Sequence, residues 1–147
     1  VEQVNNETVR KIRVLEAVNN SIHNLSQFGK KIYVVYPVPE VGFKPNERLA
    51  KNLHFERNLS ITHSYDTFLY RNRIVRGMFD KIRSSDGSIK FFDVSELICN
   101  KLTRRCKTVL ETGELLYADD NHLSDVGSDF IVDDIIDWIS DTFEFSR

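Results

Sequence analysis

The sequence has no long hydrophobic run and no excess of basic charge. Its longest apolar run, Ile32–Val38, is far shorter than the roughly 20 residues that a membrane-spanning helix needs. Lys and Arg together number 20 against 22 Asp and Glu, which gives a net charge of -2. We therefore expect neither a transmembrane segment nor a basic surface for nucleic acid or an anionic membrane.

Cysteine is also scarce, because Cys99 and Cys106 are the only two, in the string CNKLTRRC. One interpretation is a pair of buried thiols in a cytosolic protein. No neighbouring residues offer two further ligands, so a metal site is not expected. The spacing suits a short closed loop, worth roughly 2.5 kcal/mol on the chain-entropy model. We therefore favour a disulfide and an oxidising compartment.

A starting methionine and a basic-then-apolar leader are absent before Val1. We expect Val1 to be a position inside a longer protein, with any targeting signal upstream or removed. What remains is sufficient for a core, since 41% of the 147 residues are hydrophobic. This size and composition predict one globular domain, or part of one.

Apolar residues at three- and four-residue spacing predict helices, and short β-branched or aromatic runs predict strands. The expected helices are 7–28, 46–53, 64–82, 93–99 and 124–143, and the expected strands are 32–38 and 89–94. A small hairpin is predicted between 106–110 and 115–117 across Thr112 and Gly113. His63, in ITHS, is expected in a turn.

The order of helices and strands predicts an α/β fold with a mainly parallel sheet flanked by helices. The 32–38 run is apolar on both faces, as in a strand covered on both sides. The loop PVPEVGFKP follows it, where such sheets place ligands. Pro39 and Glu40 are therefore candidate substrate-binding residues. Glu40 and Arg48 near this loop are candidates to line a polar substrate cleft, and the competing interpretation, which the sequence favours, places both on the solvated surface.

The string YADDNHLSDVG contains Asp119 and His122, three residues apart. A carboxylate on Nδ1 of a histidine fixes its tautomer and stabilises the imidazolium, which general-base catalysis requires. The competing interpretation is an acidic helix start with His122 on the surface. Spacing alone favours this second interpretation.

The phrase LYADDNHLSDVGSDFIVDDI resembles the final sequence block of the SGNH hydrolases. Within them it is most similar to the extracytoplasmic domain of the acyltransferase family 3 membrane proteins, which O-acetylate bacterial surface polysaccharides. The strand before PVPEVGF and the strand FFDV before the cysteine pair agree with that branch. The resemblance extends over about residues 31–136 and implies a flavodoxin-like order.

The resemblance assigns roles to individual residues of this chain. The family's Asp-x-x-His pair matches Asp119 and His122, so His122 would be the general base and Asp119 its orienting partner. Asp120, two residues before the histidine, is the competing candidate for Asp119. Ser124 follows His122 in the family phrase and is interpreted as a helix cap rather than a nucleophile.

The family's nucleophilic serine has no counterpart here. None of the six glycines is followed by Asp-Ser, and no G-x-S-x-G string occurs. Either the 147 residues are the C-terminal half of a complete domain, or the protein never had the serine. We favour the first explanation, with a partial domain over residues 1–147 that lacks the nucleophile block.

The resemblance implies an acyl-transfer or esterase domain that acts on O-acyl groups of a cell-envelope polysaccharide. We expect the acyl group to be acetyl. No metal or organic cofactor is expected. The parent protein would be embedded in a bacterial inner membrane through upstream segments, with this domain on the periplasmic face. The chain would associate with its missing half or with a second copy. The alternative is a non-catalytic carbohydrate-binding or interaction domain of the same fold.

Overall fold

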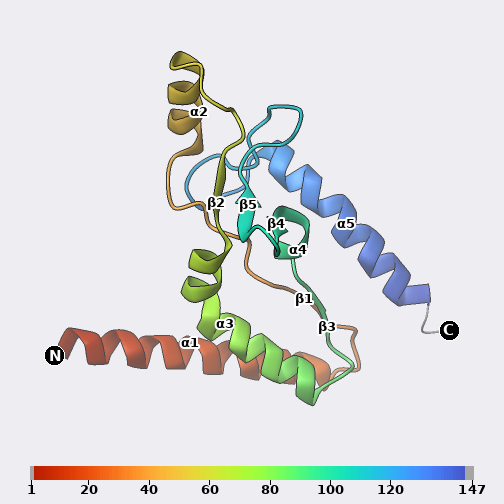
Figure 1. The fold of residues 1–147 in the computed structure, drawn as a ribbon. Helices are drawn as coiled ribbons and strands as arrows, with labels where there is room; N and C mark the ends of the chain where they lie inside the picture. The colour runs from red at the N-terminus through yellow and green to blue at the C-terminus, as the bar shows by residue number, and fades with distance from the viewer. Residues whose placement is uncertain (1, 145–147) are drawn as a thin grey trace. The chain divides into compact units, whose positions relative to one another are not determined.

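The computed structural model describes residues 2–144 as a mixed α/β chain (Figure 1). Two compact units are present: described residues up to 35 with 72–91, and residues 36–71 with those from 92 on. The predicted helices and both predicted strands form, with ends shifted by a few residues. The elements are α1 (Glu2–Ser26), β1 (Tyr33–Val35), α2 (Pro45–His54), β2 (Thr62–Ser64), α3 (Tyr65–Ser85), β3 (Lys90–Phe92), α4 (Ser95–Ile98), β4 (Cys99–Asn100), β5 (Arg105–Lys107) and α5 (Asp125–Glu144).

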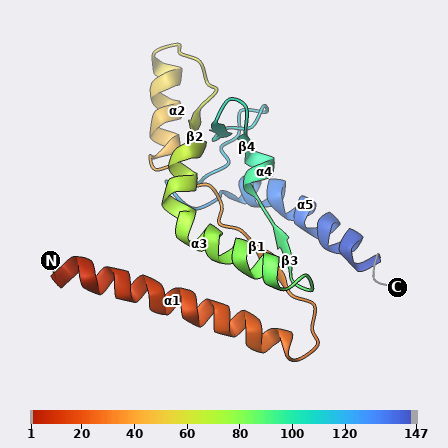
Figure 2. The same ribbon diagram turned by 60° about the horizontal axis from the view of Figure 1, so that its bottom comes forward.

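The first unit contains α1 and the C-terminal part of α3, which lie side by side (Figure 2). Leu15 of α1 and Ile74 of α3 line one groove between them. Ile22, on the predicted apolar stripe of α1, is buried, and so is Phe79 of α3. Leu25 of that stripe is 52% exposed. The periodicity therefore predicted the helices, but α1 buries only part of its apolar stripe.

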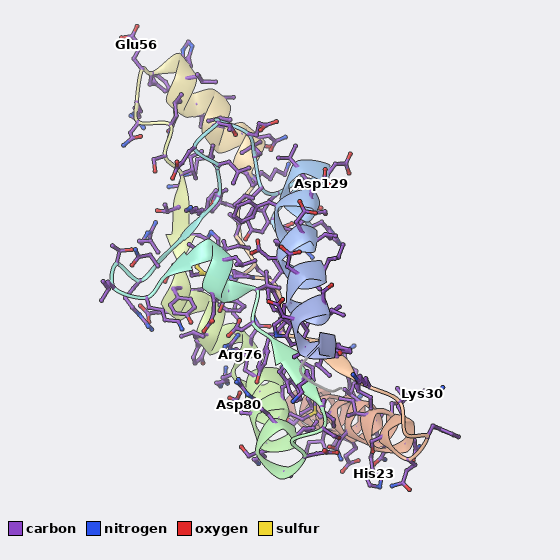
Figure 3. The ribbon with its side chains drawn as sticks, turned by 90° about the vertical axis from the view of Figure 1, so that its right-hand side faces the viewer. His23, Lys30, Glu56, Arg76, Asp80 and Asp129 are labelled. Atoms are coloured by element: carbon purple, nitrogen blue, oxygen red, sulfur yellow. A yellow bond between two sulfur atoms is a disulfide. The ribbon has the colours of Figure 1, made fainter. Side chains whose placement is uncertain are left out.

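The second unit holds the main hydrophobic core. α5 packs against it through Ile131, while Asp129 on the same helix is exposed (Figure 3). This matches the apolar face predicted from the sequence. The buried members of the core are Val41, Tyr65, Phe68, Val94, Ile98, Cys99, Cys106, Leu116, Tyr117 and Ile131.

The predicted disulfide is confirmed. Cys99 and Cys106 are joined with an S–S distance of 2.02 Å, and they are direct partners in the antiparallel pair of β4 and β5. Asn100 supports the intervening turn, since its Oδ1 accepts hydrogen bonds from the backbone N–H groups of Leu102 and Thr103, both at 2.9 Å. The buried disulfide therefore closes an exposed chain reversal over residues 100–105.

The prediction of a mainly parallel sheet needs correction for the described residues. β1 and β3 form a sheet of two strands, whereas β2, β5 and β4 form an antiparallel sheet of three. An antiparallel pair needs only a short turn between its strands, but a parallel pair needs a crossover of a dozen or more residues. The short segment between Cys99 and Cys106 therefore permits only the antiparallel arrangement.

β2 was missed, because its three residues are too short to show a strand period. The structure pairs His63 with Cys106, so the expected turn is instead a strand beside the disulfide. The predicted hairpin is confirmed next to its turn, where the Leu110 N–H donates to Glu114 O at 2.8 Å and the Leu116 N–H donates to Thr108 O at 3.0 Å. Val109 bridges Leu115 and Gly113 takes a φ of 91°, while Cys106 pairs with β2 and β4.

Candidate functional site

Asp119 and His122 are brought together within one turn. Asp119 Oδ2 lies 2.8 Å from His122 Nδ1, and its Oδ1 accepts backbone N–H bonds from Asn121 at 2.9 Å and His122 at 2.7 Å. Both carboxylate oxygens are therefore occupied, and the carboxylate is held by the backbone as well as by the ring. This leaves Nε2 of His122 as the nitrogen that can exchange a proton with a reactant.

The ends of this turn are fixed by the backbone. The Ala118 N–H donates to His122 O at 2.9 Å, and Tyr117 forms an antiparallel bridge with Leu123. Tyr117 is buried, whereas the His122 side chain is 73% exposed. A solvent-facing histidine is thus presented from a turn that is anchored in the core.

The Asp119 and His122 groups shift each other's proton affinity in opposite directions. The backbone N–H of Asn121 contributes most, followed by the His122 ring, to lowering the pKa of Asp119 to about 2. The hydrogen bond to Asp119 is the main cause that raises the pKa of His122 above 6.5. Asp119 therefore stays ionised at neutral pH and stabilises the protonated imidazole.

Ser124 caps α5, as expected. Its Oγ accepts the backbone N–H of Gly127 at 2.9 Å and donates to Leu115 O at 2.6 Å. A Cβ on Gly127 would lie 2.0 Å from Leu116 O, so only glycine fits where the helix starts against the chain. The Ser-x-x-Gly spacing after His122 is therefore explained by helix capping and close backbone approach.

The loop after β1 binds the His122 turn through its backbone. The N–H groups of Val41 and Gly42 donate to Asp120 O at 3.0 and 3.1 Å. Asp120, the competing candidate for the orienting carboxylate, thus joins the turn to the PVPEVGF loop through its carbonyl. No local spacing in the sequence could reveal this long-range link.

The structure separates the two candidate substrate-binding residues. Pro39 is fully buried and presents no surface to a ligand. Glu40 is partly exposed and lines a pocket together with Val41 and Gly42. Of the two, Glu40 is the residue whose position suits a substrate contact.

His63 is the other histidine near these elements. It is 4% exposed, and its Nδ1 lies 3.1 Å from Thr108 Oγ1. Burial, with the nearby Arg105 charge, lowers its pKa to about 4. Its Nε2 and the hydroxyl of Tyr117 are buried without a hydrogen-bond partner, and the two rings pack edge to face. His63 is therefore a neutral core residue.

The Asp119 and His122 geometry is of the kind that Ser-His-Asp acyl-transfer enzymes use. The family model of the SGNH domain, described as fused to AT3 domains, matches residues 2–137. The chain belongs to this family. No curated protein and no solved structure matches the chain.

Membership indicates a hydrolase or acyl-transfer function at the level of the family, and a family of membrane proteins. Within residues 2–144, none of the helices has the length and apolar character to cross a membrane. Those same residues contain no group of three or more His, Cys, Asp or Glu side chains arranged to hold a metal ion.

Proposed function

We propose that this chain supplies the Asp and His of a Ser-His-Asp acyl-transfer site. The observation that carries the proposal is the 2.8 Å contact between Asp119 Oδ2 and His122 Nδ1, with the carboxylate also held by two backbone N–H groups. Family membership over residues 2–137 supports it. The serine belongs to the domain's nucleophile block, which these 147 residues lack.

In this mechanism neutral His122 donates its Nδ1 proton to Asp119 as a hydrogen bond. His122 Nε2 takes the proton of the serine hydroxyl as the serine oxygen attacks the acyl carbonyl carbon. The protonated ring returns that proton to the leaving alcohol oxygen, which leaves an acyl-serine. Water or a sugar hydroxyl then gives its proton to Nε2 and takes the acyl group. The serine regains its proton as it leaves.

The substrate we propose is an O-acyl group, chiefly acetyl, on a polysaccharide of the cell envelope. The family's fusion to AT3 domains supports this assignment, as does the Cys99–Cys106 disulfide, which suits an oxidising compartment. The domain would lie at the periplasmic face of a bacterial inner membrane, and the reaction needs no metal or organic cofactor.

The complete domain would extend the β1 and β3 pair with further strands. Val35 of β1 is 41% exposed, and an uncovered strand edge is a template for pairing. We therefore propose that the chain associates with its missing half or with a second copy. Sedimentation of the purified chain would show a dimer or larger species, and a stable monomer at all concentrations would contradict the association.

The function is tested by His122→Ala in the longer protein that contains the upstream residues. Hydrolysis of p-nitrophenyl acetate should fall at least about 100-fold, because general-base catalysis typically contributes that much or more. His54→Ala is the matched control, since His54 is an exposed histidine of the same unit that packs on Phe55. Unchanged turnover in His122→Ala would remove His122 from the mechanism.

A non-catalytic carbohydrate-binding domain is the second candidate. It is favoured by the absence of any Gly-Asp-Ser string from these residues. The coding frame upstream of Val1 discriminates between the two candidates. A Gly-Asp-Ser block after an apolar strand, preceded by membrane-spanning segments, supports the acyltransferase, whereas its absence supports the binding domain.

A further inference from the structure

One pocket of the second unit is lined in part by the loop that binds the His122 turn. It measures about 230 Å³ and is lined by residues 40–43, by β2 and by three arginines. Arg48 comes from α2, Arg71 from α3 and Arg105 from β5. Three elements distant in sequence thus bring guanidinium groups to one small cavity.

The pocket carries a net positive charge. Glu40 is the single acidic residue of its lining, and it lies 3.6 Å from Arg71. The guanidinium of Arg48 instead stacks on the Phe43 ring, 4.6 Å from its centroid, and none of the described carboxylates forms an ion pair with it. One of the three guanidinium charges is therefore partly neutralised by a carboxylate, and Arg48 is not.

The third arginine is oriented by neutral acceptors. Arg105 donates from Nε to Thr62 Oγ1 at 2.9 Å and from Nη2 to Thr62 O at 2.8 Å. These bonds position the guanidinium without cancelling its charge. His63, which also lines the pocket, is neutral at physiological pH because burial lowers its pKa to about 4. Three cations therefore face one carboxylate.

The pocket and the His122 turn are connected through the same loop. Val41 and Gly42 line the pocket, and their N–H groups donate to Asp120 O at 3.0 and 3.1 Å. Asp120 lies between the two members of the Asp119 and His122 pair. The pocket wall and the His122 turn are therefore joined directly by two backbone hydrogen bonds.

We propose that the Arg48, Arg71 and Arg105 pocket binds a carboxylate or phosphate group of the saccharide substrate. A guanidinium group is planar and presents a fork of N–H donors that binds two oxygens of a carboxylate or a phosphate at once. A volume of about 230 Å³ is smaller than the roughly 300 Å³ at which drug-sized ligand sites begin, so one charged group or sugar unit fits. The role in substrate binding rests on the proposed function, whereas the anion site itself does not.

The test is a titration of the 147-residue chain with glucuronate, glucose 1-phosphate and neutral glucose. Binding is followed by the chemical shifts of the arginine Nε–H groups. We expect saturable shifts at Arg48 and Arg105 with one or both anions and none with glucose. Shifts from glucuronate alone identify a carboxylate site, and shifts from the phosphate alone identify a phosphate site. Equal shifts with glucose would overturn the proposal.

Arg48→Gln should raise the dissociation constant for the bound anion about fivefold, because a charge-assisted hydrogen bond is lost at an exposed position. Arg57→Gln is the matched control. It removes the same charge from an arginine stacked on Phe55, 5.2 Å from the ring centroid, and Arg57 does not line the pocket. Equal weakening by the two substitutions would show general electrostatics and overturn a site at Arg48.

A third substitution separates this proposal from the proposed function. His122→Ala should leave anion binding unchanged, because His122 does not line the pocket. If the 147-residue chain binds the anion but His122→Ala leaves turnover by the longer protein unchanged, the pocket is supported and the acyl-transfer role is contradicted. If His122→Ala abolishes turnover but no anion binds at Arg48, the acyl-transfer role is supported and the anion pocket is overturned.

Discussion

His122 and His63 lie in the same unit of the protein, and their surroundings shift their pKa values in opposite directions. His122 is 73% exposed and bonds a carboxylate, whereas His63 is 4% exposed and contacts a neutral hydroxyl. The pKa of His122 is raised, and that of His63 is lowered to about 4. The presence of a histidine in a sequence therefore indicates little about function until its hydrogen-bond partner and its burial are known.

The difference has a simple physical cause. Burial removes water from the charged form of His63, and none of the carboxylates in the described residues compensates for that loss. His122 keeps its water and gains Asp119, so the charged form is favoured. Of these two histidines, His122 is therefore the one placed to exchange a proton with a molecule in solution near neutral pH.

The largest expected effect comes from removing the partner that distinguishes His122. Asp119→Asn should lower kcat for p-nitrophenyl acetate in the longer protein by about 10²- to 10⁴-fold, because an amide neither fixes the Nδ1–H tautomer nor stabilises the imidazolium. The midpoint of the acid side of the rate profile should also move to lower pH, since Asp119 is the main cause of the raised His122 pKa. Steady-state kinetics between pH 5 and 8, roughly the range over which histidine titrates, measure both.

Asp120→Asn is the matched control for this change. It removes the neighbouring carboxylate but keeps the carbonyl that binds the Val41 and Gly42 N–H groups. Its kcat should remain within a few-fold of the unsubstituted protein. If Asp120→Asn were the more damaging substitution, the assignment of Asp119 as the orienting residue would be wrong.

A smaller effect is expected from acid at His63. The unfolded chain takes up a proton near pH 6.5, whereas the folded His63 takes it up only near pH 4. The stability associated with neutral His63 is therefore complete above pH 6.5 and is lost as the pH falls toward 4. By linkage the loss is about 2 kcal/mol in the free energy of unfolding. Urea unfolding at pH 7 and pH 4.5 measures it.

The control for this loss is His63→Gln, measured at the same two pH values. Other acidic groups also titrate in this range, so only the difference between the two proteins reports on His63. The substituted protein should lose about 2 kcal/mol less between pH 7 and pH 4.5. Equal losses in both proteins would contradict the buried, neutral state of His63.

The sequence predicted those parts of the site whose contacts are local. Asp119 and His122 meet because they are only three positions apart in one turn, and Ser124 caps α5 through a bond to Gly127. The disulfide was also predicted correctly, because the two cysteines are close together in the sequence. The sequence did not indicate that Pro39 would be buried, because its burial depends on residues far along the chain.

Periodicity likewise predicted the helices, the strands at β1 and β3, and an α/β class. Periodicity did not predict the antiparallel sheet, because its strands β2, β4 and β5 have only two or three residues each and are stabilised by one another. His63 is a strand residue only because Cys106 lies opposite it. Pairing over such a distance leaves no period in the sequence.

By itself, then, the sequence determined the local features of this protein: the contact between Asp119 and His122, and the disulfide. Only the tertiary structure placed Arg48, Arg71 and Arg105 around one pocket and joined its wall to the His122 turn through Asp120. The physical reason is the range of each interaction. A turn is set by its own few residues, whereas a pocket is set by whichever distant elements the core packs together.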